Sequence, residues 1–280
     1  MTARSLLFVP ATSDRKIDKA FGGDADAVII DLEDAVAVAE KPAARAALVA
    51  AMATPRPLPC WVRINAMSTS FCHRDVVAAT MPGIAGIILP KAESANDIQA
   101  IDWLISQVEV ENGMPAYGVG LMAIIETARG LGKVDEIAAA SARLGRLIFG
   151  AVDLAADMSI DMDDAGGATA QARFAIARAS RAAGLQAPLD TAFTDIPDLE
   201  ALRATSMRAR ALGYSGKTCI HPTQVAVVNE VFSATPAELA WAQKVVAAFE
   251  QAEAQGLAAF KLDGEMIDYP VVERARKLLG

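Results

Sequence analysis

Residues 120–126 (GLMAIIE) and 146–153 (RLIFGAVD) are short apolar runs that each end in a carboxylate. Strands that are buried on both faces, as in parallel sheets, have this continuous apolar character. Six further runs of the same kind lie at Leu6–Pro10, Ala27–Asp31, Trp61–Asn65, Ala85–Lys91, Leu185–Asp190 and Lys217–His221. They recur about every 30 residues, which is the length of a βαβ unit. Eight parallel strands, each followed by a helix, predict an α/β fold of the TIM (β/α)8 barrel type.

Segments with helical spacing and capping residues separate the apolar runs. We expect helices at residues 13–21, 40–52, 94–110, 134–140, 170–183, 198–212 and 223–231. The competing architecture, an open doubly wound sheet, usually carries G-x-G-x-x-G after its first strand, and residues 10–14 contain no glycine. We therefore assign residues 1–232 to the barrel.

Residues 233–280 exceed what a barrel requires and form a C-terminal helical extension. Residues 236–255 predict a helix, and residues 260–269 predict an irregular piece. We expect this extension to act as a lid over the barrel or as a segment between subunits.

Composition narrows the classes of partner. The formal net charge of −8 disfavours nucleic acid and anionic membranes, which require basic patches. Three widely spaced cysteines without a C-x-x-C pair favour neither a disulfide framework nor a zinc ribbon. No signal-like segment opens the chain, and no apolar run approaches the roughly 20 residues of a membrane span. We therefore expect a cytoplasmic protein.

Glu126 and Asp153 lie at the predicted carboxyl ends of neighbouring strands, where active sites of such barrels are found. Two carboxylates that leave the other positions to water and substrate suit Mg²⁺. With only His73 and His221 in the chain, a three-histidine zinc site is excluded. The alternatives are an ion pair with a basic residue such as Arg129 and simple capping of a helix by Asp153.

A second acidic cluster, Asp31, Glu33 and Asp34, follows the second run and repels itself unless cations lie nearby. Arg63, inside the third run, would either neutralise these acids or bind a substrate carboxylate through two hydrogen bonds. A purely structural arginine is the third possibility.

Three lysines and one arginine leave further alternatives open. Arg15 and Lys19 lie on one face of the first helix and would be either solvated or in contact with a phosphate-bearing substrate. Lys91 ends its run, where it would form a Schiff base with a carbonyl substrate or pair with the acids. Lys217 begins its run, which places it at the opposite face of the barrel.

Several motifs together resemble the CitE-like acyl-CoA lyases, relatives of the citrate lyase β subunit and of malyl-CoA and citramalyl-CoA lyases in the HpcH/HpaI aldolase superfamily. The similarity extends from Arg4 to past Tyr269. The motifs are RSLLFVP (4–10), DLEDAV (31–36), VRIN (62–65), LPK (89–91), IETA (125–128), GK (216–217), IHP (220–222), DG (263–264) and MID (266–268).

The resemblance implies a Mg²⁺-dependent TIM barrel and assigns roles to individual residues. Glu126 and Asp153 match the metal ligands, and Arg63 matches the arginine that binds the α-keto acid carboxylate. Asp268 matches a carbon acid/base that reaches a neighbouring subunit from a mobile C-terminal segment. The positions that match contacts to coenzyme A or its acyl channel are Phe8, Arg15, Lys19, Ile220 and His221. Asp31, Glu33 and Asp34 would hold metal-bound waters and orient Arg63.

The expected reaction is therefore cleavage or formation of a β-hydroxyacyl-CoA, with acyl-CoA and an α-keto acid (glyoxylate, pyruvate or oxaloacetate) as the partners. A homo-oligomer, with a trimer favoured, is implied by the same resemblance. A malyl-CoA thioesterase and a β subunit of a multi-subunit citrate lyase remain as alternatives. A Schiff-base aldolase using Lys91 is less favoured, because it would leave Glu126 and Asp153 without a role.

Overall fold

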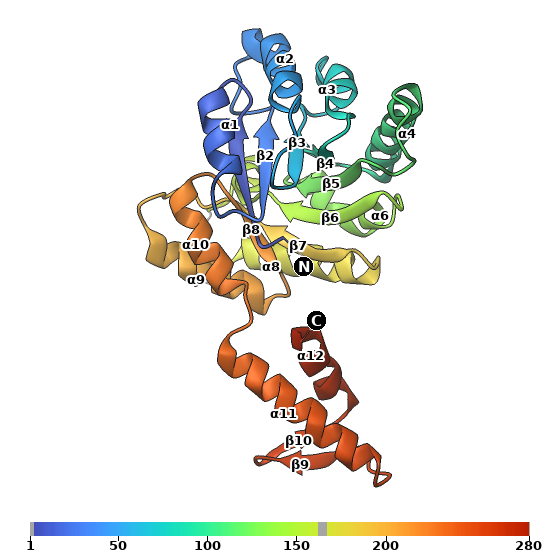
Figure 1. Ribbon diagram of the computed structural model, residues 1–280, viewed down its shortest axis with the longest axis vertical. Helices are drawn as coiled ribbons and strands as arrows, with labels where there is room; N and C mark the ends of the chain where they lie inside the picture. Colours follow the sequence, from blue (N-terminus) through green and yellow to red (C-terminus); the bar gives the residue numbers. More distant parts are fainter. Residues whose placement is uncertain (1–2, 162–166, 280) are drawn as a thin grey trace. The chain divides into compact units, whose positions relative to one another are not determined.

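The computed structural model describes residues 3–161 and 167–279. The chain divides into two compact units, Met1–Phe232 and Ser233–Gly280, and each is described by itself. In the first unit, eight parallel strands pair in sequence order and close into a barrel (Figure 1). The strands are β1 (Ser5–Pro10), β2 (Ala27–Asp31), β3 (Cys60–Arg63), β4 (Ile84–Leu89), β5 (Gly120–Ile125), β6 (Leu144–Phe149), β7 (Gln186–Asp190) and β8 (Gly216–Cys219). The predicted (β/α)8 barrel is confirmed.

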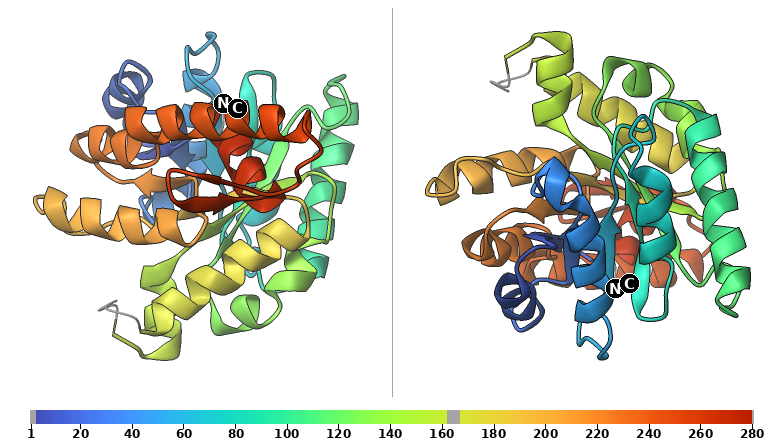
Figure 2. Two further views of the ribbon diagram at one scale, coloured as in Figure 1. Left: turned by 90° about the horizontal axis from the view of Figure 1, so that it is seen from below. Right: turned by 90° about the horizontal axis from the view of Figure 1, so that it is seen from above.

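Helices lie around the outside of the strands (Figures 1 and 2). They are α1 (Asp14–Phe21), α2 (Lys41–Ala51) after the short 3-10 helix η1 (Val38–Glu40), α3 (Cys72–Ala79), α4 (Ala95–Glu111), α5 (Ala128–Gly132), α6 (Val134–Ala138), α7 (Ala151–Met158), α8 (Ala168–Ala182), α9 (Leu199–Ala211) and α10 (Pro222–Val231). The large core lies between these helices and the strands.

Alternate strand residues point into the barrel and fill it. The inner cluster consists of Leu6, Ala27, Ile29, Ile88, Met122, Ile124, Ile148 and Leu189. At the amino-terminal end of the strands, the buried Arg146 guanidinium donates to Ala3 O, Ala187 O and Ser215 Oγ at 2.8, 2.6 and 2.7 Å. This end of the barrel is therefore filled by side chains, and the polar residues described below gather at the other end.

Several predicted runs extend past the ends of their strands, and the run at residues 146–153 does so by the most. The run Arg146–Asp153 contains the end of β6 at Phe149 and the start of α7 at Ala151, so Asp153 lies in the first turn of a helix. Gly150, at the helix N-cap, supplies no side-chain cap that would mark the boundary in the sequence. The apolar run continues past the strand because Ala151 and Leu154 of α7 are buried as β6 is.

The second unit contains α11 (Pro236–Glu253), a hairpin of β9 (Phe260–Leu262) and β10 (Glu265–Ile267), and α12 (Tyr269–Leu279). Its own core includes Val245, Phe249, Ile267 and Val272. The prediction of an irregular piece at residues 260–269 was wrong, because the strands pair through a tight turn. None of the described helices is long and apolar enough to cross a membrane.

Candidate functional site

Asp31 and Arg63 form the centre of the polar end of the barrel. They face each other as register partners at the last positions of β2 and β3. The Asp31 carboxylate accepts hydrogen bonds from Arg63 Nε and Nη2, both at 2.7 Å. It also accepts from the backbone N–H groups of Glu33 and Ala35 at 2.9 and 3.0 Å. The Asp31 carboxylate thereby accepts four hydrogen bonds. It fixes both the Arg63 guanidinium and the turn that follows β2.

Arg63 presents its remaining nitrogen to the other two acids of this turn. Nη1 lies 3.2 Å from both Asp34 Oδ2 and Glu33 Oε2. The guanidinium stacks on the Phe8 ring at 4.7 Å from its centroid. Burial would lower the pKa of Arg63, but the acids, Asp31 above all, outweigh it and raise the pKa. Asp34 is largely exposed, so the Nη1 side of this permanently charged arginine is the one nearest to solvent-exposed groups.

Two side chains that the sequence analysis missed hold the turn after β2. The buried Lys41 Nζ donates to Leu32 O and Glu33 O at 2.8 and 2.6 Å. Asn65 Nδ2 donates to Leu32 O at 2.9 Å, and its backbone N–H donates to Asp75 at 3.0 Å. These contacts satisfy carbonyls that would otherwise be buried without partners. Nothing in the sequence around Lys41, the first residue of α2, indicates that its side chain binds these carbonyls.

Glu126 follows β5 directly and is almost fully buried, with 3% of its surface exposed. Its Oε1 accepts a hydrogen bond from the Lys91 backbone N–H at 2.8 Å. Gly150 leaves the space that the carboxylate occupies, because a Cβ there would lie 2.5 Å from both Cβ and Oε2 of Glu126. Sequence reasoning missed Gly150, since only the structure shows the close approach.

Lys91 links the two acidic groups. Its Nζ lies 3.1 Å from Glu33 Oε1 and 3.6 Å from Asp153 Oδ1. The neighbourhood of Glu126 and Asp153 predicted from the sequence is thus present, although Asp153 comes from a helix rather than from a strand end. Arg129, the alternative partner, pairs with Glu93 instead.

The acids of this cluster are held in an environment that disfavours their charge. Burial, together with the nearby charges of Asp153 and Glu33, raises the pKa of Glu126 to about 8. Burial also raises the pKa of Glu33, in spite of the neighbouring cations. Among the described residues, no three His, Cys, Asp or Glu side chains converge as a ready-made metal cage. Two neighbouring carboxylates, the buried Glu126 and the partly exposed Asp153, nevertheless suit Mg²⁺, which takes its remaining oxygen ligands from water and substrate.

The electrostatics disfavour a Schiff base at Lys91. Burial would lower its pKa, but Glu33, Glu126 and Asp153 outweigh that effect and raise it. A Schiff-base lysine needs the opposite shift, because the neutral amine is the nucleophile. Lys217, the second candidate, is near the start of β8, opposite the first residue of β1, and its buried ammonium is ion-paired with Asp190.

The predicted contacts to coenzyme A lie outside this cluster, apart from Phe8. Arg15 and Lys19 are exposed on α1, four residues apart. His221 is the N-cap of α10, where Nδ1 accepts from the Thr223 N–H at 3.3 Å, and Ile220 before it is 39% exposed.

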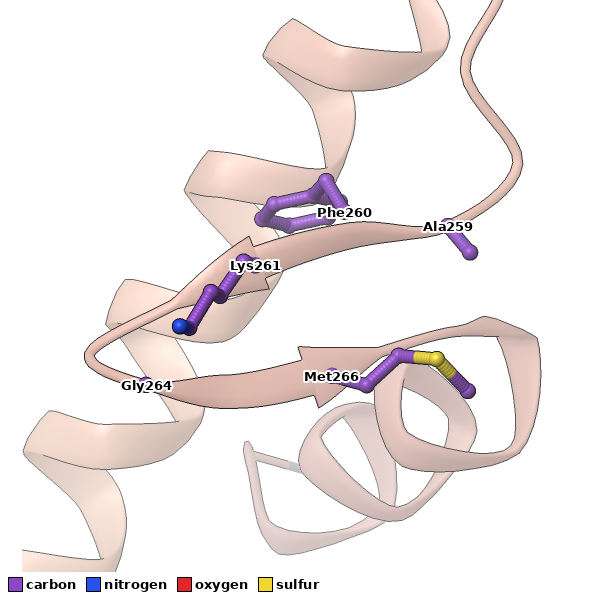
Figure 3. A pocket seen from close by; sticks show the side chains of 5 residues that line it. All are labelled: Ala259, Phe260, Lys261, Gly264 and Met266. Carbon is purple, nitrogen blue, oxygen red and sulfur yellow. The ribbon is translucent and has the colours of Figure 1, made fainter.

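Asp268 lies in the second unit, between β10 and α12. Its Oδ1 accepts a hydrogen bond from Val271 N–H at 3.4 Å. In the adjoining hairpin, Lys261 and Met266 are paired across the strands, beside a pocket of about 420 Å³ (Figure 3). Phe260 belongs to the unit's own core, as does Ile267.

Comparison with known proteins gives a consistent result. The family model described as HpcH/HpaI aldolase/citrate lyase matches residues 4–222, and one described as C-C bond lyase of the TIM-barrel fold matches residues 180–276. The chain is 37% identical to citrate lyase subunit beta of Leuconostoc mesenteroides subsp. cremoris, covering 99% of this chain and 92% of that protein.

Two relatives with other activities are about equally similar. L-malyl-CoA/beta-methylmalyl-CoA lyase of Rhodobacter capsulatus is 35% identical, and (3S)-malyl-CoA thioesterase of Cereibacter sphaeroides is 36% identical. Each match covers 99% of this chain and 93% of the relative. Among solved structures, CitE from Mycobacterium tuberculosis in complex with magnesium, acetoacetate and coenzyme A has a TM-score of 0.81 at 34% identity. That match covers 99% of this chain and 97% of the other.

Proposed function

Because the chain belongs to the HpcH/HpaI aldolase/citrate lyase family, we propose that it is a Mg²⁺-dependent carbon–carbon lyase acting on a β-hydroxyacyl-CoA of the malyl-CoA or citramalyl-CoA type. The products of cleavage are an acyl-CoA and an α-keto acid, such as glyoxylate or pyruvate. The observation that carries the proposal is the placement of Arg63 beside the Glu126 and Asp153 carboxylates at one end of the barrel, with Lys91 and Glu33 between them.

The chain's own residues bind and orient the substrate. Arg63, fixed by Asp31, binds the carboxylate of the keto acid portion through its Nη1 edge. Phe8 supports the guanidinium from the barrel interior. Glu126 and Asp153 would hold the metal, while Glu33 and Asp34 orient Arg63 and would accept hydrogen bonds from water beside the metal. A Mg²⁺ ion held there would favour loss of the substrate hydroxyl proton and stabilise charge on the keto acid oxygen.

Cleavage then breaks the bond between the hydroxyl-bearing carbon and the carbon next to the thioester. The electron pair of that bond passes to the thioester as an enolate, and the hydroxyl-bearing carbon becomes the carbonyl of the keto acid. The hydroxyl proton leaves to solvent water, and protonated Asp268 donates its proton to the enolate carbon and is reprotonated from solvent. In the reverse direction the Asp268 carboxylate removes the proton from that carbon. Arg15 and Lys19 bind phosphates of coenzyme A, and Ile220 and His221 line its acyl channel.

Product analysis with the purified chain tests the proposal. With Mg²⁺ and malyl-CoA or citramalyl-CoA, we expect glyoxylate or pyruvate together with an acyl-CoA. A panel of β-hydroxyacyl-CoA thioesters then identifies the substrate, because one methyl group changes specificity by only about 10- to 200-fold. Neither product from any thioester of the panel would contradict the proposal.

Two relatives favour alternatives that the same assay separates. Similarity to the malyl-CoA thioesterase predicts free hydroxyacid and coenzyme A instead of keto acid. Similarity to citrate lyase subunit beta predicts a chain that is inactive until the other subunits of such a complex are added. We favour the lyase, because Asp268 offers the acid/base that carbon–carbon cleavage requires. The match to citrate lyase subunit beta also spans this segment, so the assay of the chain alone decides whether other subunits are needed. The three buried, unpaired cysteines support a reducing, cytoplasmic setting.

A further inference from the structure

Lys91 has an unusual backbone conformation at the centre of the acidic cluster. Its φ is +49°, in the left-handed region that β-carbon-bearing residues rarely adopt. The conformation directs its N–H at Glu126 Oε1. Its ammonium meanwhile lies between Glu33 and Asp153, which belong to different elements of the barrel.

Donation of the backbone N–H to Glu126 does not by itself explain why position 91 is a lysine. Glycine would adopt a positive φ without strain and would donate the same N–H to Glu126. The side chain must therefore contribute something that offsets the backbone strain. The contribution visible in the structure is a positive charge among three carboxylates.

We propose that Lys91 is a positioning residue whose ammonium acts as the resident counter-cation of Asp153 and Glu33 and competes with the divalent metal for Asp153. This inference rests on the proposed function, since it takes Glu126 and Asp153 as the metal ligands. Lys91 holds the Asp153 carboxylate in place while the metal is absent and lowers the affinity for metal alone.

Glu33 provides the position to which the ammonium withdraws. Its Oε1 already accepts from Lys91 Nζ at 3.1 Å, the shorter of the two contacts. Its Oε2 is buried and lies 3.2 Å from Arg63 Nη1 without making a hydrogen bond, so it can accept one when the ammonium leaves Asp153. A lysine ammonium suits this exchange, because it has three donors on a flexible stem.

The test is the affinity for Mg²⁺ alone, without substrate, by isothermal titration calorimetry. A pH of 9 keeps Glu126 ionised, so that loss of the lysine charge does not act through protonation of the ligands. We expect Lys91→Met to bind Mg²⁺ about tenfold more tightly than the native chain, a change of about 1.4 kcal/mol. Lys91→Arg keeps the positive charge, and we expect an affinity within about twofold of the native value.

Two further variants make the result decisive. Lys133→Met removes the same charge from an exposed position after α5, and we expect no change in affinity. Lys91→Gly removes the ammonium and relieves the backbone, so it should fold at least as stably and also bind Mg²⁺ more tightly.

If folded Lys91→Met and Lys91→Gly bind Mg²⁺ no more tightly than the native chain, the inference is overturned. The proposed function is then left intact. Mg²⁺ binding that persists in Glu126→Gln would instead show that Glu126 is not a metal ligand. Both the inference and the proposed function would then be contradicted. Absence of binding in the native chain and in both Lys91 variants would overturn both.

Discussion

Gly150 leaves the space that the Glu126 side chain occupies. A Cβ at this position would overlap with Glu126 Cβ and Oε2 at 2.5 Å. We expect Gly150→Ala to displace the carboxylate, to weaken Mg²⁺ binding at least tenfold and to destabilise the fold by about 1–3 kcal/mol, as overpacking does. Calorimetric titration with Mg²⁺ and chemical denaturation measure the two effects.

Gly132→Ala is the matched control, because nothing lies within 4 Å of a Cβ there. At the end of α5, alanine should leave Mg²⁺ affinity unchanged and should not reduce stability. Native affinity in folded Gly150→Ala would show that Glu126 does not need its present position to bind the metal.

Asp31 separates positioning of the keto acid from metal binding. Asparagine at this position retains one acceptor but loses the charged, two-point contact that fixes Arg63. We therefore expect Asp31→Asn to raise the KM for the keto acid in the condensation direction by about tenfold or more, with little change in Mg²⁺ affinity. Steady-state kinetics with varied keto acid would contradict this role if only kcat changed.

Individual site residues differed in how far the sequence revealed them. Glu126, Asp31 and Arg63 were predictable, because each lies at the end of, or just after, an apolar run, where a barrel collects its functional groups. Gly150 and Lys41 were not, since their roles depend on contacts with Glu126 and with the carbonyls after β2. Patterns within one stretch of sequence contain no information about contacts between residues that are far apart along the chain.

At the scale of elements, the interface of α8 with β7 and β8 depends on one buried carboxylate. Asp190 accepts from Arg173 Nε at 2.7 Å and pairs with Lys217, and Asp190 and Lys217 are almost completely buried. Burial would raise the pKa of Asp190, but the two cations outweigh it and lower the pKa. The sequence could not reveal this network, because its members lie on three separate elements.

We expect Asp190→Asn to destabilise the protein by about 3–5 kcal/mol, since it leaves two buried cations without their anion. Because the folded-state pKa of Asp190 is depressed, its contribution is complete above the unfolded value of about 3.9 and is lost as the pH falls through the folded value. The free energy of unfolding, measured by denaturant titration from neutral to acid pH, should depend less on acid pH in the variant.

Asp135→Asn provides the comparison for an exposed pair. Asp135 and Arg178 are more than half exposed, so their loss should cost less than about 1 kcal/mol. Equal effects of the two substitutions would contradict the importance assigned to the buried network.

The hairpin of the second unit has a recognisable turn signal in the sequence, Asp263-Gly264. Asp263 and Gly264 both have positive φ, at +51° and +95°, and they join β9 to β10. An Asp-Gly pair between short strand-like segments is typical of this two-residue turn. Residues 260–269 were therefore predictable as a hairpin, whereas the start of α7 was not, because Gly150 offers no capping side chain.

At the scale of the whole molecule, the proposed chemistry is divided between two compact units. The barrel carries Arg63, Glu126 and Asp153, whereas Asp268 belongs to the second unit. Asp268→Asn should therefore abolish turnover while Mg²⁺ binding by the barrel is retained. Glu126→Ala should lose both. Full activity in either variant would contradict the division.

Complementation between these two variants tests whether Asp268 serves the barrel of its own chain or that of a neighbour, as the resemblance to stand-alone lyases implies. If it acts on a neighbour, co-expressed Asp268→Asn and Glu126→Ala chains form some sites that combine an intact barrel with an intact Asp268. Random mixing in a cyclic homo-oligomer would restore about a quarter of the native activity. If Asp268 acts within its own chain, every site lacks one group and the mixture stays inactive. Activity of the mixed, purified oligomer, with each variant alone as the control, distinguishes the two arrangements.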